Sequence, residues 1–144
     1  MPAVILDTSV TVAWLLPDEP LHRQAVALRD QIVAGTMEPV VASHHRFELR
    51  HALVRAAQRH RCGWHMVPGL LGDIDEMELE VAPGPDSDGA ILALCETLRL
   101  TWADGLWVWL AMRRDVPLVT ADMGLVRAVP SDLAWIESLG DQPI

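Results

Sequence analysis

Lysine and tyrosine are absent from this sequence of 144 residues, and phenylalanine occurs only once, as Phe47. All 11 basic residues are arginines, against 20 acidic residues, so the formal net charge is −9 at pH 7. Proteins that hold nucleic acid by bulk electrostatic attraction are usually basic overall, so this charge argues against that class. Most of the six tryptophans are expected in the core or at interfaces, where they replace the missing aromatic residues.

Cysteine is scarce, because only Cys62 and Cys95 are present and they lack CxxC spacing. This excludes a disulfide framework and a zinc site, and we expect two reduced, buried thiols. Long hydrophobic runs are also missing. Asp7 interrupts the apolar stretch near the N-terminus, and no basic segment precedes it, so neither a signal peptide nor a membrane-spanning helix is expected. We therefore expect a cytoplasmic protein with no membrane partner.

Hydrophobic residues make up 51% of the chain, enough for the core of a single domain over residues 1–144. The charge is unevenly distributed. Five arginines lie between Arg46 and Arg61, and seven acidic residues lie between Asp73 and Asp88. A locally basic face can therefore coexist with an acidic pocket.

The apolar pattern predicts strands that alternate with helices. Strands are expected at residues 3–6, 39–42, 79–82, 116–120 and 133–136. Helices are expected at residues 10–16, 20–34, 44–61, 86–98 and 104–114, with a broken helix at 64–74 and a short one after residue 122. This order implies an α/β fold with a parallel sheet covered on both faces, and functional groups at the carboxyl ends of its strands.

Four acidic residues occupy positions where they could meet. Asp7 closes the first strand, Asp122 lies two residues past the fourth, and Glu48 and Asp104 each begin a helix. Any one of them alone could cap a helix, or could be stabilised by the positive N-terminal end of a helix dipole. Together, two carboxylates about 4 Å apart repel by roughly 4 kcal/mol at an effective dielectric of 20. With no lysine, and no arginine beside Asp7, Asp104 or Asp122 in sequence, an all-oxygen cluster would need a hard divalent ion such as Mg²⁺ or Mn²⁺.

Four segments containing these acids resemble, in order and spacing, the motifs of PIN domains, and most closely those of VapC-type toxins of bacterial toxin–antitoxin pairs. They are Val4-Ile5-Leu6-Asp7-Thr8-Ser9, Phe47-Glu48-Leu49-Arg50-His51-Ala52-Leu53, Trp102-Ala103-Asp104-Gly105-Leu106 and Pro117-Leu118-Val119-Thr120-Ala121-Asp122. The resemblance implies a three-layer α/β/α PIN-like fold, with a central, mainly parallel sheet of four to five strands, as one domain over residues 1–144.

The resemblance also implies a function and a site. The function is a metal-dependent endoribonuclease that hydrolyses RNA phosphodiester bonds, acting as the toxin of a pair, with a cognate antitoxin and a homodimeric state. Asp7, Asp104 and Asp122 are implied to be catalytic and to hold Mg²⁺ or Mn²⁺, with Glu48 binding directly or through water. Ser9 and Thr120 are implied as polar supports.

Arg46, Arg50 and His51 are candidate RNA contacts, and Arg55 and Arg59 extend the arginine set that could guide the RNA backbone toward the acids. The arginines could instead form a solvated helix face, and His51 could be structural. His51 stands where many relatives have asparagine, and Gly105 where alanine is common; both departures bear on substrate choice more than on metal binding.

Three other classes of protein share part of this sequence pattern. Haloacid-dehalogenase-type phosphatases also place an aspartate after the first strand, but they need a second one where this chain has Ser9. They and phospho-accepting receiver domains normally need a downstream lysine, which is absent. The third alternative is a catalytically degenerate PIN-like module that binds a protein or RNA partner without cleaving it.

Overall fold

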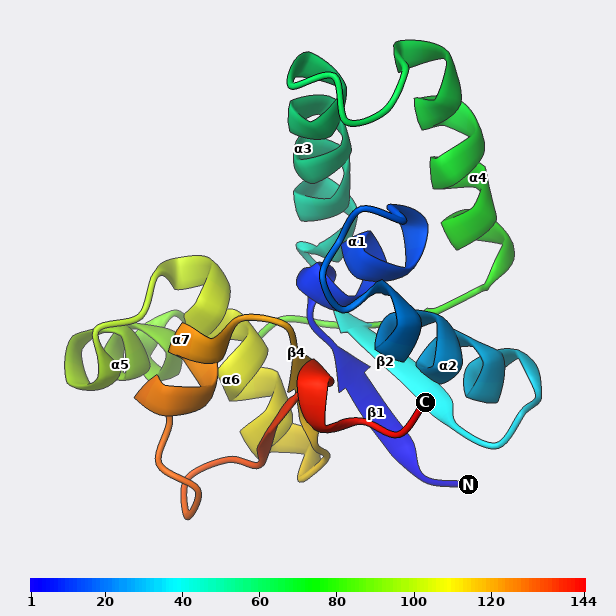
Figure 1. Ribbon diagram of the computed structural model, residues 1–144. Coiled ribbons are helices and arrows are strands. Elements are labelled where there is room, and N and C mark those ends of the chain that lie inside the picture. The colour runs from blue at the N-terminus through cyan, green and yellow to red at the C-terminus, as the bar shows by residue number, and fades with distance from the viewer.

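The computed structural model describes all residues, 1–144. Its strands are β1 (Ala3–Leu6), β2 (Glu38–Ala42), β3 (Glu80–Ala82), β4 (Leu118–Thr120) and β5 (Ile136–Ser138). Its α-helices are α1 (Thr8–Leu15), α2 (His22–Val33), α3 (His45–Gln58), α4 (Val67–Glu76), α5 (Gly89–Leu98), α6 (Trp102–Arg114) and α7 (Met123–Ala128). Two short 3₁₀ helices, η1 (Trp64–Met66) and η2 (Leu139–Asp141), complete the chain (Figure 1).

The five strands form one parallel sheet in the order β3-β2-β1-β4-β5. The chain first winds outward from β1 to β2 and β3, then crosses back to β4 and continues to β5. Because parallel crossovers are right-handed, the two directions of winding place helices on opposite faces of the sheet. Accordingly α1 packs on β1 and β4, while α6 packs on β2 and β4. The mainly parallel α/β sheet expected from the sequence is confirmed, with five strands.

The strand order reverses between β1 and β4, and this determines where a site can form. In open parallel sheets a crevice opens beyond the carboxyl ends of the two strands at such a switch point. Asp7 directly follows β1, and Asp122 lies two residues beyond β4. The topology therefore brings two acids 115 positions apart in the sequence to the same edge of the sheet.

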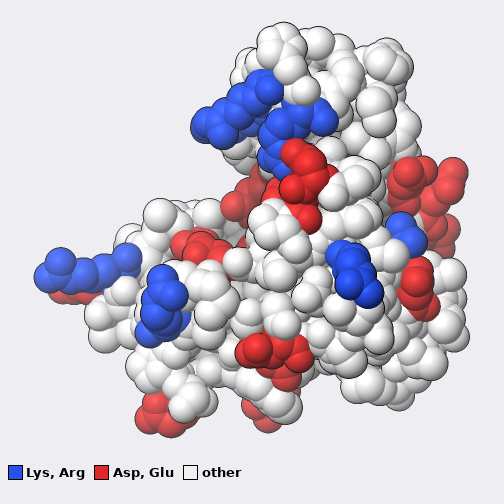
Figure 2. Space-filling view, in the orientation of Figure 1, with Lys and Arg blue, Asp and Glu red and all other residues white.

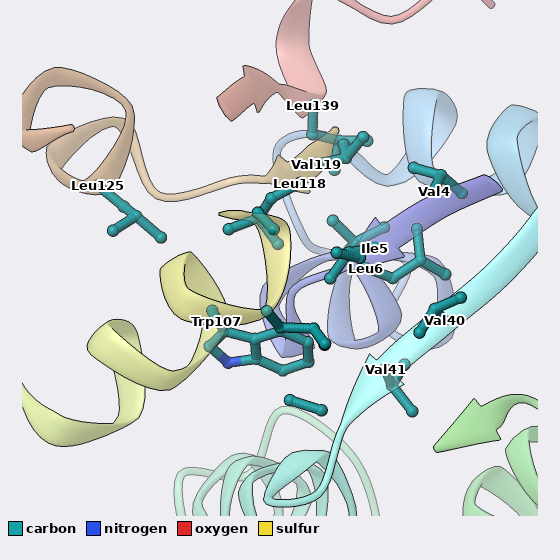
Figure 3. Close-up of a cluster of buried hydrophobic side chains, with 14 of the residues drawn as sticks. Val4, Ile5, Leu6, Val40, Val41, Trp107, Leu118, Val119, Leu125 and Leu139 are labelled. Atoms are coloured by element: carbon teal, nitrogen blue, oxygen red, sulfur yellow. The ribbon is translucent and has the colours of Figure 1, made fainter. Parts of the chain in front are cut away.

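The core surrounds β1, whose residues Ile5 and Leu6 have no exposed surface. A continuous apolar run is typical of a central parallel strand, because helices cover both of its faces. Trp107 of α6 is also fully buried and packs within this cluster, beside the strands (Figure 3). Its indole therefore fixes α6 against the sheet.

The predicted element order is confirmed, but one strand prediction was wrong. The last strand is Ile136–Ser138, whereas residues 133–136 were predicted. Trp135 lies outside the strand and is exposed, although its carbonyl accepts a hydrogen bond from the Leu118 amide. Cys62 and Cys95 are both free and half-buried, less buried than expected. None of the helices has the length and apolar character needed to cross a membrane.

Candidate active site

A pocket of about 880 Å³ opens at the carboxyl edge of the sheet, and all four predicted acids line it. They come from four places: Asp7 from the β1–α1 junction, Glu48 from α3, Asp104 from α6 and Asp122 from the β4–α7 junction. Figure 2 shows acidic side chains in the hollow between the part of the molecule that holds α3 and the part that holds α5 and α7. No arginine lines the pocket, and its only basic side chains are histidines.

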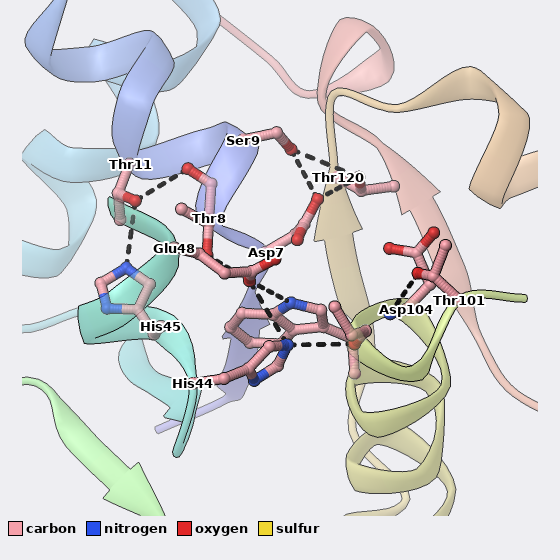
Figure 4. A network of polar contacts seen from close by, with 12 residues as sticks. Asp7, Thr8, Ser9, Thr11, His44, His45, Glu48, Thr101, Asp104 and Thr120 are labelled. Carbon is pink, nitrogen blue, oxygen red and sulfur yellow. Dashed lines mark hydrogen bonds and ion pairs between the residues drawn. The ribbon is translucent and has the colours of Figure 1, made fainter. Parts of the chain in front are cut away.

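Asp7 is buried at the N-terminus of α1, yet its side chain does not cap that helix. Its Oδ2 atom instead accepts hydrogen bonds from Ser9 Oγ and Thr120 Oγ1, both at 2.7 Å (Figure 4). Burial raises the pKa of Asp7 and the charge of Glu48 adds to this, while the Ser9 and Thr120 hydroxyls oppose the rise. The two hydroxyls therefore orient this carboxylate.

The same two hydroxyls connect Asp7 to Asp122. Ser9 Oγ accepts a hydrogen bond from the Ala121 amide, and Thr120 Oγ1 accepts one from the Asp122 amide, each at 3.0 Å. Asp122 then caps α7, because its Oδ1 accepts from the Gly124 and Leu125 amides. The loop after β4 is thereby held against the start of α1.

Glu48 has one oxygen that is held by several donors. Its Oε1 accepts hydrogen bonds from Thr8 Oγ1 at 2.9 Å and from Trp107 Nε1 at 3.0 Å, and His44 Nε2 lies 3.3 Å away. Side-chain donors from α1 and α6 therefore hold this oxygen of Glu48. Because Trp107 is fully buried, its N–H fixes the position of this oxygen.

The two ring nitrogens of His44 lie in different surroundings. Its Nε2 lies 3.0 Å from the Ala103 carbonyl, which can only accept, so Nε2 carries a proton. Its Nδ1 is buried and has no hydrogen-bond partner, so a second proton there would be an unsatisfied buried donor. The hydrogen bond of His44 Nε2 is therefore made to Ala103, and Glu48 Oε1 lies beside it as a close contact at 3.3 Å.

His45, the next residue, fixes the start of α3. It is buried, and its Nε2 lies 3.0 Å from Thr11 Oγ1 of α1. Burial lowers the pKa of His45 to about 4, so its ring is neutral near pH 7. The contact holds the first turn of α3, and with it Glu48, beside α1.

Asp104 lies in the first turn of α6 without capping it. Thr101 is the cap, because its hydroxyl accepts from the Asp104 amide at 3.2 Å. Burial, followed by the charges of Asp7, Asp122 and Glu48, raises the pKa of Asp104 to about 6, and a hydrogen bond from Thr101 offsets part of this. The charges of all three other acids therefore act on Asp104.

The donor set fits a hard cation. Asp7, Glu48 and Asp122 each have one oxygen held by protein donors, and their second oxygen receives no hydrogen bond from any side chain. Carboxylate oxygens are the ligands that Mg²⁺ and Mn²⁺ prefer. As the side chains lie, no three His, Cys, Asp or Glu residues form a ready-made metal site. The four side chains therefore fit a hard cation by their chemical type and by their convergence in one pocket, and not by a preformed coordination geometry.

The other predicted site residues fall on two faces of α3. His51 lines the acidic pocket, whereas Arg46 and Arg50 line a separate, smaller hollow between α3, α4 and β3. Arg46 there lies 3.6 Å from Asp75. His51 follows Glu48 by three positions and so shares its helical face. Arg46 and Arg50 are turned away from the acids.

Sequence reasoning missed several residues around the acids. His44 and Trp107 contact Glu48, and Phe47 and Trp102 are exposed aromatic side chains that line the pocket. A histidine one turn before Glu48 was the only available signal for His44. Trp107 lies within an apolar helix, so its sequence position suggested only a core residue.

Comparisons with known proteins show the family and the fold. The family model described as the PIN domain matches residues 4–129. No curated protein matches the sequence. Among solved structures, PAE2754 from Pyrobaculum aerophilum is similar with a TM-score of 0.72 and 18% identity, over 96% of this chain and 85% of the other. VapBC2 from Rickettsia felis, bound to a DNA fragment from its promoter, has a TM-score of 0.66 and 15% identity, over 94% and 98%. FitAcB from Neisseria gonorrhoeae has a TM-score of 0.57 and 18% identity, over 96% and 99%.

Proposed function

The chain belongs to the PIN-domain family, and from this premise we propose that it is a metal-dependent endoribonuclease, the VapC-type toxin of a toxin–antitoxin pair. The observation that supports this most directly is the pocket in which Asp7, Glu48, Asp104 and Asp122 converge without an arginine. The name of the neighbour VapBC2 agrees with the group that the four motifs resemble. We further propose a cytoplasmic homodimer and an antitoxin partner.

In the proposed site Asp7, Asp104 and Asp122 hold Mg²⁺ or Mn²⁺, and Glu48 binds directly or through water. A bound ion of this kind lowers the pKa of a water molecule and stabilises charge on a phosphate. Ser9 and Thr120 keep Asp7 oriented, and Trp107 and Thr8 keep Glu48 oriented. Fixed ligands need little reorganisation when the RNA phosphate arrives.

The proposal is tested by expressing the chain alone in bacterial cells and mapping new RNA 5′ ends. We expect the intact protein to generate discrete ends and the Asp7→Asn variant to generate none. Asp18→Asn is the matched control, because it also removes one carboxylate but lies in an ion pair with Arg61, outside the set of four acids.

A purified sample then tests the requirement for metal. Cleavage of total RNA should stop with EDTA and resume with excess Mn²⁺. Equal cleavage by the Asp7→Asn variant, or unchanged cleavage in EDTA, would contradict the proposal. Absence of any cleavage by the intact protein with Mn²⁺ would instead favour the degenerate, binding-only module.

A further inference from the structure

Gly105, which directly follows Asp104 in α6, is a buried residue with no side chain. Its position in the sequence suggested a part in substrate choice, but it does not line the acidic pocket. Its backbone does not require glycine either, because Gly35 is the only glycine of the chain with a positive φ. Glycine is less favourable than alanine inside a helix, since it loses more conformational freedom on folding. A glycine here therefore needs a reason that lies outside α6.

The side of Gly105 that would carry a Cβ atom faces α5, which packs directly on α6 (Figure 1). A Cβ atom there would lie 3.0 Å from Cys95 Sγ and 3.1 Å from Ile91 Cγ2. Ordinary van der Waals contacts of a Cβ atom lie between 3.4 and 4 Å, so both distances are too short without a movement. Ile91 has no exposed surface, and a close-packed core leaves it little room to yield. The missing Cβ therefore determines how closely α5 and α6 approach each other.

The contact between α5 and Gly105 also includes Thr101, the residue that caps α6. Cys95 Sγ donates a hydrogen bond to the Thr101 carbonyl at 3.5 Å, and the Gly105 amide donates to the same carbonyl at 2.9 Å. The Thr101 hydroxyl in turn accepts a hydrogen bond from the Asp104 amide (Figure 4). The packing of α5 on Gly105 is thereby connected to the backbone of Asp104.

Asp104 depends on this backbone more than the other three acids do. Each of the other three has a carboxylate oxygen that accepts two hydrogen bonds. Asp104 is held mainly through the first turn of α6, where Thr101 binds its amide. From the opposite direction, His44 Nε2 of the segment before α3 lies 3.0 Å from the Ala103 carbonyl. The first turn of α6 is thus fixed by contacts with α5 and with the start of α3.

We propose that Gly105 is a positioning residue for Asp104, because the packing of α5 on its bare backbone keeps Asp104 in the group of four acids. This rests on the proposed metal-dependent function and adds a residue that acts through Asp104 without touching the ion or the RNA. A Cβ atom at Gly105 pushes the first turn of α6 away from α5. Asp104 is the adjacent residue of the same helix, so it moves as well, and the four carboxylates then fit a common cation less well.

The proposal is tested by isothermal titration of the metal-free protein with Mn²⁺. Gly105→Ala adds only a Cβ atom, and we expect Mn²⁺ affinity to fall about tenfold, a loss typical of residues that orient a metal ligand. Gly72→Ala is the matched control. Gly72 lies inside α4, where a Cβ atom meets nothing within 4 Å, so this variant should bind Mn²⁺ as the parent does. Both variants replace a helical glycine by alanine, so the contact with α5 is what distinguishes them.

A second substitution tests whether the contact with α5 causes the loss. Cys95→Ala removes the atom that lies closest to the added Cβ, so Gly105→Ala combined with Cys95→Ala should recover most of the lost Mn²⁺ affinity. Cys95→Ala alone should bind Mn²⁺ as the parent does. Two independent weakenings of the structure would add to each other, whereas relief of a contact makes the second substitution cancel the first. If Gly105→Ala does not fold, Cys95→Leu crowds the same contact from α5 and should show the same loss.

Parent-like Mn²⁺ affinity in Gly105→Ala would overturn the proposal, as would a loss that Cys95→Ala does not reduce. Crystal structures of the metal-free parent and of Gly105→Ala give a readout that needs no ion. The proposal expects Asp104 to be displaced relative to Asp7 in the variant, and an unchanged arrangement of the acids would overturn it. If the parent binds no Mn²⁺, the proposed function fails, and this displacement still decides whether Gly105 positions Asp104.

Discussion

Two groups of carboxylates on this molecule lie in opposite electrostatic surroundings. Asp18 and Glu19 are paired with Arg61, at 2.8 and 3.3 Å, and the hydrogen bond from Arg61 lowers the pKa of Asp18. In the pocket, burial and three neighbouring acids raise the pKa of Asp104 to about 6. Asp18 and Glu19, of which Glu19 also lines the pocket, thus have a cation of the chain as their partner, whereas Asp7, Asp104 and Asp122 have none. The difference supports the proposal that the pocket binds a cation from outside the chain.

The largest effect is expected from a substitution that places a cationic side chain inside the pocket. Ala52 lines the pocket four residues after Glu48, so Ala52→Lys creates a favourable i, i+4 pair there. An ammonium close to the acids would compete with a divalent ion, and we expect RNA cleavage at fixed Mn²⁺ to fall about 100-fold, equivalent to roughly 2.7 kcal/mol. Gln58→Lys, on the exposed end of the same helix, adds the same charge and should leave the rate unchanged. Equal rates for the two variants would contradict this electrostatic account.

Trp107→Phe removes the buried indole N–H that donates a hydrogen bond to Glu48 Oε1. A hydrogen bond to a charged group contributes about 1.5–3 kcal/mol, so the free energy of unfolding should fall by at least about 2 kcal/mol once the cavity is included. Cleavage should fall as well, because Glu48 loses its orientation. Urea denaturation measures the first effect. Trp14→Phe, at a buried tryptophan with no side-chain hydrogen bond, controls for the cavity and should cost less.

The pH dependence of stability separates Asp104 from the paired acids. Between pH 4 and 6 folded Asp104 retains a proton that the unfolded chain, with a pKa of 3.8, has released. Release of this proton therefore lowers the free energy of unfolding as pH rises from 4 to 6. Above pH 6 the effect of Asp104 on stability no longer changes with pH. In EDTA, Asp104→Asn should equal the parent near pH 4 and exceed it by about 1 kcal/mol at pH 7, a value reduced for partial exposure. A difference in the free energy of unfolding that shrinks as pH rises would contradict the raised pKa of Asp104.

The smallest effect is expected from breaking the Asp18–Arg61 pair. Both side chains are accessible, so Asp18→Asn should cost about 0.5 kcal/mol at low salt. The lowered pKa of Asp18 means that this stabilisation is present above pH 4 and is lost as pH falls. Thermal melts at low and high salt measure it. Salt should abolish the difference from the parent, and a loss of several kcal/mol would show that the pair is more than a surface contact.

The sequence predicted the order of all strands and helices, because central parallel strands and amphipathic helices have distinct apolar patterns. It misplaced the last strand because β5 is an edge strand that pairs only with β4. Glu137 and Ser138 pair with Val119 and Thr120 of β4, although neither of them is apolar. The apolar residues 133–136, which include the exposed Trp135, therefore matched the pattern of a strand better than residues 136–138 do.

The four acids were recognisable because each follows a strand or opens a helix. The residues that orient Glu48 were not, because their role depends on contacts across the fold. Trp107 is 59 positions from Glu48, and nothing in an apolar helix predicts where an indole N–H points. Phe47, an apolar residue at the start of the predicted helix, is exposed beside the pocket. Side-chain direction at a helix start depends on how the helix docks, which periodicity does not specify.

The most direct test of the central claim is isothermal titration of the metal-free protein with Mn²⁺. The claim predicts saturable binding by the parent, binding lost or weakened at least tenfold in Asp104→Asn, and unchanged binding in Asp18→Asn. Absence of Mn²⁺ binding by the parent, or equal affinity in all three proteins, would contradict it.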